Sequence, residues 1–111
     1  MMHYPLKAKS KWADDPQYSG GKLTWMTPDA YLSRVPKLGS KKDAAIVEKH
    51  VKRIEKGKKL KPLAIYSSGN PNGRHRATAA KELGIAKVPV LVGGHEPAKY
   101  DGKLAVKGKK P

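Results

Sequence analysis

Three basic residues, Arg74, His75 and Arg76, follow the turn residues Asn72 and Gly73 where the sequence predicts the start of a helix. Cations in a first helical turn oppose the positive end of the helix dipole, where a sequence shaped for helix stability alone would carry Asp or Glu. A bound anion would resolve this mismatch, because unpaired backbone N–H groups and two guanidinium groups would converge on a phosphate. The alternative is a solvated basic turn, with Arg76 packed by its aliphatic stem.

His75 is also the candidate catalytic residue, because an imidazole exchanges a proton near neutral pH and can act as a general acid or base. A metal is not expected to assist it. The histidines at positions 50, 75 and 95 lack the close spacing of metal motifs. A two-metal nuclease needs several clustered carboxylates, whereas the nine Asp and Glu residues of this chain form no obvious metal motif.

The basic motif stands between a polar turn and an alanine-rich helix. Residues 77–83 are mostly good helix formers. Gly84 follows them where a helix commonly ends, since glycine adopts a left-handed conformation without steric cost. Residues 88–92 then form an apolar, β-branched run typical of a buried strand. The local order is therefore loop, helix, turn and strand.

Two predicted helices and a strand precede the motif. Residues 27–29, Thr-Pro-Asp, are a helix start, and we expect a short helix over about residues 28–34. A second helix is predicted from about residue 43 to residue 56, and a strand over residues 63–66. The link over residues 67–72 is too short for a full hairpin, so any strand there is shortened or absent. The stripe of the second helix that faces the core consists of Val47, His50, Val51 and Ile54.

These elements predict a small α+β domain, with helices packed on a small sheet, over residues 23–100. Residues 1–22 are expected to form a flexible N-terminal arm, whose aromatic residues more often dock on their own domain than stack on bases. Residues 101–111 form a basic, Lys-rich tail, and residues 104–106 are a candidate edge strand. His50, beside the buried stripe, is expected to be a packed histidine rather than a catalytic one.

Charge is the strongest compositional signal. The chain carries 24 Lys and Arg against 9 Asp and Glu, a net charge of +15. An excess of this size predicts attraction to a polyanion, most simply nucleic acid; an anionic membrane or an acidic protein is the alternative. On the second predicted helix only Glu48 and Glu55 lie near the cations Lys49, Lys52, Arg53 and Lys56. The residues expected to contact nucleic acid are Lys41, Lys42, Lys52 and Lys56.

The composition also excludes several classes of protein. Cysteine is absent, which rules out a disulfide framework, a thiolate zinc site and thiol catalysis. No apolar run approaches the roughly 20 residues that span a bilayer, and the first residues lack the apolar core of a secretory signal. We therefore expect a cytoplasmic protein with no membrane partner.

Residues 73–92, GRHRATAAKELGIAKVPVLV, resemble the signature of the ParB/sulfiredoxin superfamily, in particular its short, phage-type ParB-like nuclease domain members. Residues 26–38, MTPDAYLSRVPKL, resemble the N-terminal part of the phage proteins. The resemblance covers roughly residues 27–92. It implies a small ParB/sulfiredoxin-like fold and a protein that works in the cytoplasm of a phage-infected bacterium.

The net charge, the basic motif and the resemblance together leave three alternative functions open. The first is a nucleic-acid-binding protein, with DNA favoured over RNA, that has a phosphate site at Gly73–Arg76 and in some members nuclease activity. The second is a nucleotide-binding or phosphoryl-transfer domain that uses ATP or CTP with magnesium. The third is a non-enzymatic phage factor that interacts with a host protein. Whether the protein is an enzyme, and its oligomeric state, stay open.

Carried over by the motif, Gly73, His75 and Arg76 would hold phosphate. Lys49 and Arg53, one turn apart on the preceding helix, would complete that site. Arg74 stands where sulfiredoxins carry their nucleophilic cysteine, so the sulfiredoxin reaction itself is excluded. Full ParB partition function is not expected either, because no helix-turn-helix or dimerisation domain follows.

Overall fold

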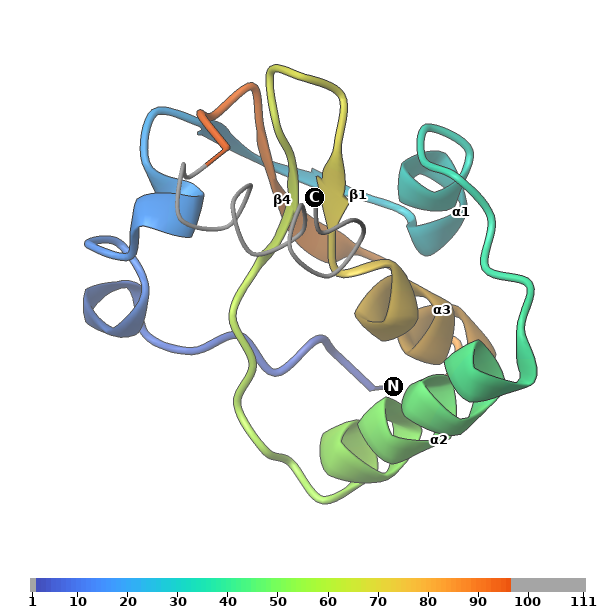
Figure 1. Cartoon of the computed structure of the whole chain (residues 1–111). Helices are drawn as coiled ribbons and strands as arrows, with labels where there is room; N and C mark the ends of the chain where they lie inside the picture. The colour runs from blue at the N-terminus through green and yellow to red at the C-terminus, as the bar shows by residue number, and fades with distance from the viewer. Residues whose placement is uncertain (1, 97–111) are drawn as a thin grey trace.

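A four-stranded mixed sheet forms one side of the protein (Figure 1). A computed structural model gives this fold and describes residues 2–96 of the 111-residue chain. The strands lie in the order β1–β4–β2–β3; β4 is parallel to β2, and the two outer pairs are antiparallel. Their bounds are Lys22–Met26 for β1, Leu63–Ile65 for β2, Pro71–Asn72 for β3 and Val88–Val92 for β4.

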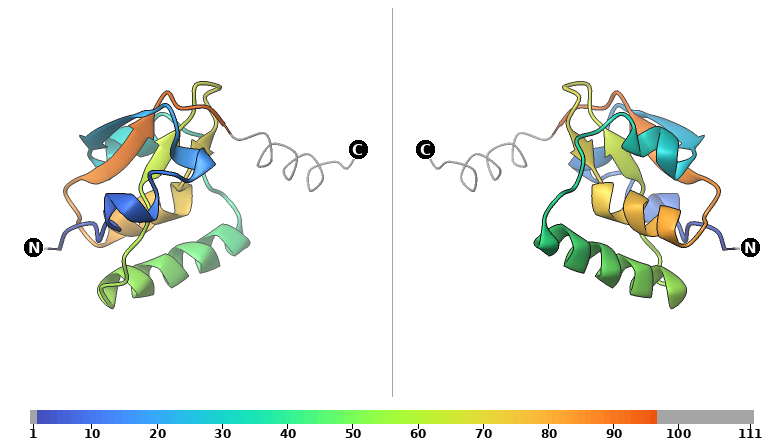
Figure 2. Two further views of the ribbon diagram at one scale, coloured as in Figure 1. Left: turned by 90° about the vertical axis from the view of Figure 1, so that its left-hand side faces the viewer. Right: turned by 90° about the vertical axis from the view of Figure 1, so that its right-hand side faces the viewer.

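Three α-helices pack on this sheet in two layers. Helices α1 (Pro28–Leu32) and α3 (Arg74–Glu82) are neighbours, and α3 contacts β2. Helix α2 (Lys41–Glu55) packs against α3. Figure 2 shows α2 on the side of α3 away from the sheet. The predicted α+β domain with helices on a small sheet is confirmed at this level.

Side-chain caps set the helix starts. Thr27 caps α1 by accepting a hydrogen bond from the backbone N–H of Ala30, at 3.0 Å. Ser40 and Asp43 form a reciprocal capping box at the start of α2. Helix α2 therefore begins two residues before the predicted position 43 and ends one residue before the predicted position 56. Helix α1 ends at Leu32, two residues before the predicted position 34.

The link between β2 and α3 contains the shortened strand. Its two residues, Pro71 and Asn72, pair with Ile65 and Ala64. Gly84 has a φ of +73°, which confirms the predicted left-handed position after α3.

The sheet buries side chains on both faces. On the helix side, Leu63, Val88 and Val90 are fully buried and belong to the main core with Tyr31 of α1 and Ala77 of α3. The opposite face carries a second cluster, made of Trp12, Tyr18, Ala64, Tyr66 and Leu91. Because strand side chains alternate between faces, neighbouring residues of β2 and β4 supply both clusters.

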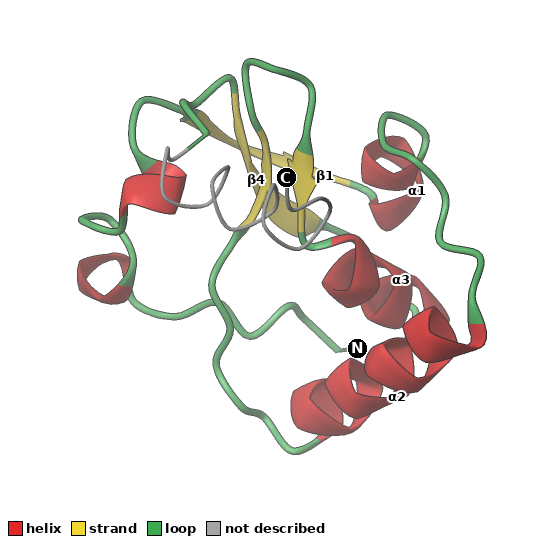
Figure 3. Ribbon diagram, viewed as in Figure 1, coloured by secondary structure: helices red, strands yellow, loops and turns green. Residues whose placement is uncertain are grey.

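The N-terminal segment is packed against the domain, so the predicted flexible arm is wrong for residues 2–22. Two short 3-10 helices, Lys9–Lys11 and Pro16–Tyr18, lie beside the sheet (Figure 3, red, on the far left). The segment buries Tyr4, Trp12 and Tyr18, which agrees with the expectation that its aromatic residues dock on their own domain. The predicted tail (residues 101–111) and edge strand (104–106) lie outside the described residues.

Candidate phosphate and acid–base site

Gly73 joins β3 to α3 in a conformation that favours glycine. Its φ is +108°, and a Cβ atom at this position would lie 2.8 Å from Cγ of Leu63. Buried Tyr31 fixes the residue before it, because the Tyr31 hydroxyl donates to the carbonyl of Asn72 at 3.0 Å. The start of α3 is therefore held against β2 and α1 with no space for a side chain.

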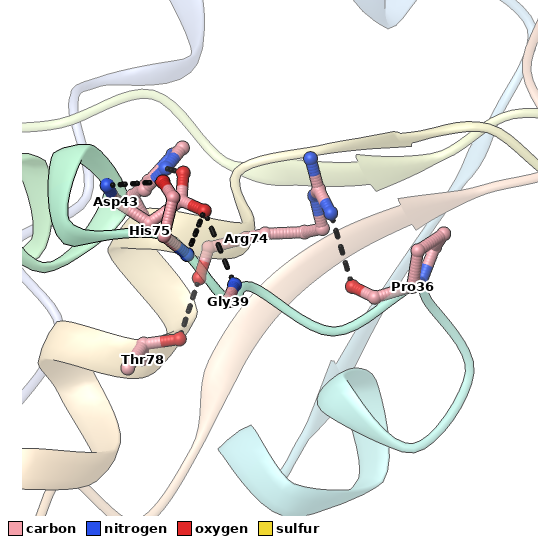
Figure 4. Close-up of polar contacts among 7 residues, drawn as sticks. Pro36, Gly39, Asp43, Arg74, His75 and Thr78 are labelled. Atoms are coloured by element: carbon pink, nitrogen blue, oxygen red, sulfur yellow. Dashed lines mark hydrogen bonds and ion pairs between the residues drawn. The ribbon is translucent and has the colours of Figure 1, made fainter.

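Arg74 connects the start of α3 to the loop between α1 and α2. Its Nη1 donates to the carbonyl of Pro36 at 3.1 Å. Figure 4 shows the side chain stretched away from His75 toward that loop. The backbone carbonyl of Arg74 accepts a hydrogen bond from Thr78 Oγ1 at 2.9 Å, within the first turn and a half of α3. Arg74 thus has a structural partner in the described structure.

His75 forms a close pair with Asp43, in the first turn of α2. The distance from His75 Nε2 to Asp43 Oδ1 is 2.8 Å. The other carboxylate oxygen accepts from the backbone N–H groups of Gly39 and Ser40, at 3.2 Å each (Figure 4). The hydrogen bond from His75, followed by the one from the Ser40 backbone, holds the pKa of Asp43 well below its usual range.

This pairing gives the imidazole a defined orientation. An ionised carboxylate can only accept hydrogen bonds, so Nε2 of His75 carries a proton and Nδ1 of the neutral ring is the nitrogen that can accept one. About a quarter of each side chain is exposed, 25% for His75 and 26% for Asp43, so solvent reaches the pair. A histidine oriented by a carboxylate in this way is the arrangement that general-base catalysis uses.

Arg76 turns inward, in a third direction. Its Nη1 donates to the carbonyl of Lys61, and its Nη2 donates to Oδ1 of Asn72 at 3.3 Å. Tyr4 Oη lies 3.5 Å from the same Nη1. The guanidinium lines a pocket of about 300 Å³ that also contains Lys7, Tyr18, Lys59 and Lys61. The three side chains of the basic motif therefore contact three different parts of the fold.

A second pocket lies beside Asp43 and has the opposite charge. It has a volume of about 380 Å³ and is lined by Asp43, Glu48 and Glu82 together with Ser40 and Thr78. Three carboxylates at one pocket repel an anion. This pocket beside Asp43 is thus an unfavourable place for a nucleotide's phosphates.

His50 lies half-buried on α2, next to the motif. Burial, followed by the positive charges of Arg76 and Arg53, lowers the pKa of His50 to about 4. The imidazole is therefore neutral at pH 7, as expected for a packed histidine. Within residues 2–96, no three His, Asp or Glu side chains come together in a way that could hold a metal ion.

The cations predicted on the second helix all lie on the exposed surface of α2. Lys49 and Arg53 are exposed on α2, whereas Arg74, His75 and Arg76 each contact the partners described above. The six-residue phosphate site stays a prediction. Lys52 pairs with Glu48 one turn away, at 3.6 Å. The exposed cations are Lys41, Lys42, Lys49, Lys52, Arg53 and Lys56.

Two parts of this arrangement are absent from the sequence-based predictions. The pattern Ser40-x-x-Asp43 indicates a capping box but not that His75 is the partner of Asp43. The pocket around Arg76 depends on Lys7 and Tyr18, which reach it only because the N-terminal segment docks. No local pattern in the sequence signals that docking site.

No family model, curated protein or solved structure matches this chain. The resemblance to the ParB/sulfiredoxin superfamily therefore stays a prediction. None of the helices in the described part of the chain is long and apolar enough to cross a membrane.

Proposed function

We propose that this protein binds nucleic acid through the exposed face of α2. The observation that carries the proposal is the composition of that face, which has six cations and only two acids, Glu48 and Glu55. Lys41 and Lys42 extend this basic face to the first turn of α2.

The length of the face supports a polyanion rather than a single small anion. Helix α2 has 15 residues, which corresponds to about 22 Å at 1.5 Å per residue. Its cations extend along this whole length, from the first turn to the residue after the last turn. A nucleic acid backbone offers phosphates over such a distance, and its contacts with Lys and Arg release counterions. The preference for DNA over RNA comes from the family resemblance alone.

A charge-matched comparison tests this proposal. The first variant replaces Lys49, Arg53 and Lys56 on α2 with Ala, and the second replaces the exposed Lys22, Lys37 and Lys87 elsewhere. Both lose three positive charges. We expect the α2 variant to bind DNA about tenfold more weakly than the control variant at low salt, because it loses phosphate contacts as well as net charge. Equal loss in the two variants would show that the α2 face is not the binding surface.

A second function, hydrolysis of a phosphodiester, is favoured by the Asp43–His75 pair. In the proposed step, Nδ1 of His75 takes a proton from water, whose oxygen forms a bond to phosphorus. The bond from phosphorus to the sugar oxygen breaks, and the protonated imidazole returns the proton to that leaving oxygen. Asp43 stabilises the imidazolium between the two transfers. We propose a nucleic acid bound on α2 as the substrate, because Asp43 belongs to the same helix as the exposed cations.

Substitution of the pair separates catalysis from binding. His75→Gln and Asp43→Asn should each abolish cleavage of DNA or RNA while affinity changes less than twofold, since neither side chain belongs to the α2 face. Cleavage that survives His75→Gln would refute the acid–base role. If the parent protein binds nucleic acid but cleaves none, and hydrolyses no nucleotide, the protein acts as a binding factor, and a host protein partner becomes the next question.

A further inference from the structure

Arg76 is a half-buried cation without a carboxylate partner among the described residues. Its contacts go to the carbonyls of Lys61 and Pro62, the amide oxygen of Asn72 and the hydroxyls of Tyr4 and Tyr18. None of these partners is a carboxylate. Burial raises the pKa of Tyr4 to about 12, so this phenol is not ionised at pH 7 and supplies no negative charge. The contacts fix the guanidinium but leave its charge uncompensated.

Three lysines from two other segments line the same pocket. Lys7 comes from the docked N-terminal segment, and Lys59 and Lys61 precede β2. The backbone N–H of Lys7 donates to Leu60 at 2.8 Å, which joins the two segments at this point. In the part of the chain that the structure describes, only Lys61 has an acidic partner, Asp15, at 2.9 Å. Four cations therefore surround a pocket of about 300 Å³, with one carboxylate beside them.

We propose that this pocket, the Arg76 pocket, binds the phosphomonoester group at the end of a nucleic acid strand. A phosphomonoester carries a charge of about −1.5 to −2 at neutral pH and offers three terminal oxygens. The charge surplus of the pocket matches such a dianion better than the single charge of an internal diester. The fixed guanidinium contributes a positive charge at the pocket wall, and the ammonium groups of Lys7 and Lys59 can donate hydrogen bonds to the phosphate.

A neighbouring hollow accommodates the rest of the terminal nucleotide. It has a volume of about 600 Å³ and is lined by Leu6, Lys7, Ala8, Lys11 and Lys59. It shares Lys7 and Lys59 with the Arg76 pocket, so the two hollows are adjacent. Leu6 and Ala8 give it an apolar surface against which a sugar and base can pack. This assignment deepens the proposed function, because it takes the ligand to be a nucleic acid strand.

Two adjacent lysines provide a matched pair of variants. Lys59 lines both hollows, whereas Lys58 is equally charged and exposed but lines neither. Replacing either with Ala removes one charge, so general attraction to nucleic acid falls by the same amount. The binding of single strands with a 5′-phosphate, a 3′-phosphate or only hydroxyl ends is measured by fluorescence anisotropy at constant salt. Binding of a free nucleoside monophosphate is measured by calorimetry.

We expect a strand with a terminal phosphate to bind several-fold tighter than its hydroxyl counterpart in the parent and in Lys58→Ala, but not in Lys59→Ala. The preferred end, 5′ or 3′, identifies the source of the phosphate. Equal affinity for phosphorylated and hydroxyl strands in the parent overturns the assignment and leaves the proposed function intact. If no strand binds but a nucleoside monophosphate binds in a Lys59-dependent way, the pocket is supported and the proposed function is overturned.

Discussion

Asp43 serves two purposes at once, and they explain the basic turn that opposes the helix dipole. It caps α2 through the backbone of Gly39 and Ser40, and its other oxygen holds His75. The negative charge beside the first turn of α3 is thus supplied by the protein itself. Arg74 and Arg76 use backbone carbonyls instead. A basic helix start therefore does not by itself require an external anion.

The decrease in the free energy of unfolding at low pH should report on Asp43. The pKa of the Asp43 carboxyl is lower in the folded protein than in the unfolded chain. The ionised carboxylate therefore stabilises the fold at pH values above the unfolded pKa, which is near 3.9. This stabilisation is lost as the pH falls through the folded pKa. Asp43→Asn should be less stable than the parent at pH 6, and the difference should shrink toward pH 2. Urea unfolding over this pH range measures it. A difference that stays constant with pH would contradict the ion pair.

Gly73 tests the packing beneath the motif. Gly73→Ala should destabilise the protein by about 2–3 kcal/mol, since it combines a left-handed φ with a clash against Leu63. Gly84→Ala is the control, because Gly84 also has a positive φ but faces open space. It should cost only about 1 kcal/mol. Equal costs in thermal or urea unfolding would mean that Leu63 does not limit the space at Gly73.

At the scale of elements, the sequence predicts best where a local signal acts alone. The Thr27 cap, the Gly84 stop and the apolar run of β4 each depend on neighbouring residues, and each predicted element exists. The Asp43–His75 contact joins residues 32 positions apart and follows from the packing of α2 on α3. The six-residue phosphate site stays a prediction, because tertiary packing decides where each side chain points.

The docking of the N-terminal segment is likewise difficult to predict from the sequence. The segment has no hydrophobic period, so its docking could be expected only from the presence of Tyr4, Trp12 and Tyr18. Trp12 is anchored by stacking edge-on to Tyr18, with ring centres 5.9 Å apart, and by a hydrogen bond from Nε1 to the carbonyl of Lys7. These contacts place Lys7 at the Arg76 pocket.

Trp12→Ala should release this segment. The substitution removes a buried indole and should cost about 3 kcal/mol or more. Limited trypsin digestion should then cut after Lys7, Lys9 or Lys11 well before the rest of the domain is digested. The exposed Trp25, mutated to Ala, is the control, because its side chain lies outside the core. Equal protection of the segment in Trp12→Ala and the parent would show that the docking does not depend on Trp12.

For the whole molecule, charge and shape point to one orientation of binding. Helix α2 forms the outer layer, away from the sheet (Figure 2). The docked N-terminal segment brings Lys7 next to Lys59 and Arg76 at the Arg76 pocket. A strand that contacts α2 with its backbone and the pocket with its end would use two basic regions that the fold keeps separate from the acidic pocket beside Asp43.

The salt dependence of nucleic acid binding tests the central claim most directly. The affinity of the parent and of the α2 triple variant for one DNA duplex is measured over a series of salt concentrations. We predict that log K falls linearly with log salt, and that the slope of the variant is shallower by about 2–3, since each lost phosphate contact contributes about 0.9. Parent binding that is undetectable at low salt, or that does not change with salt, would contradict the account.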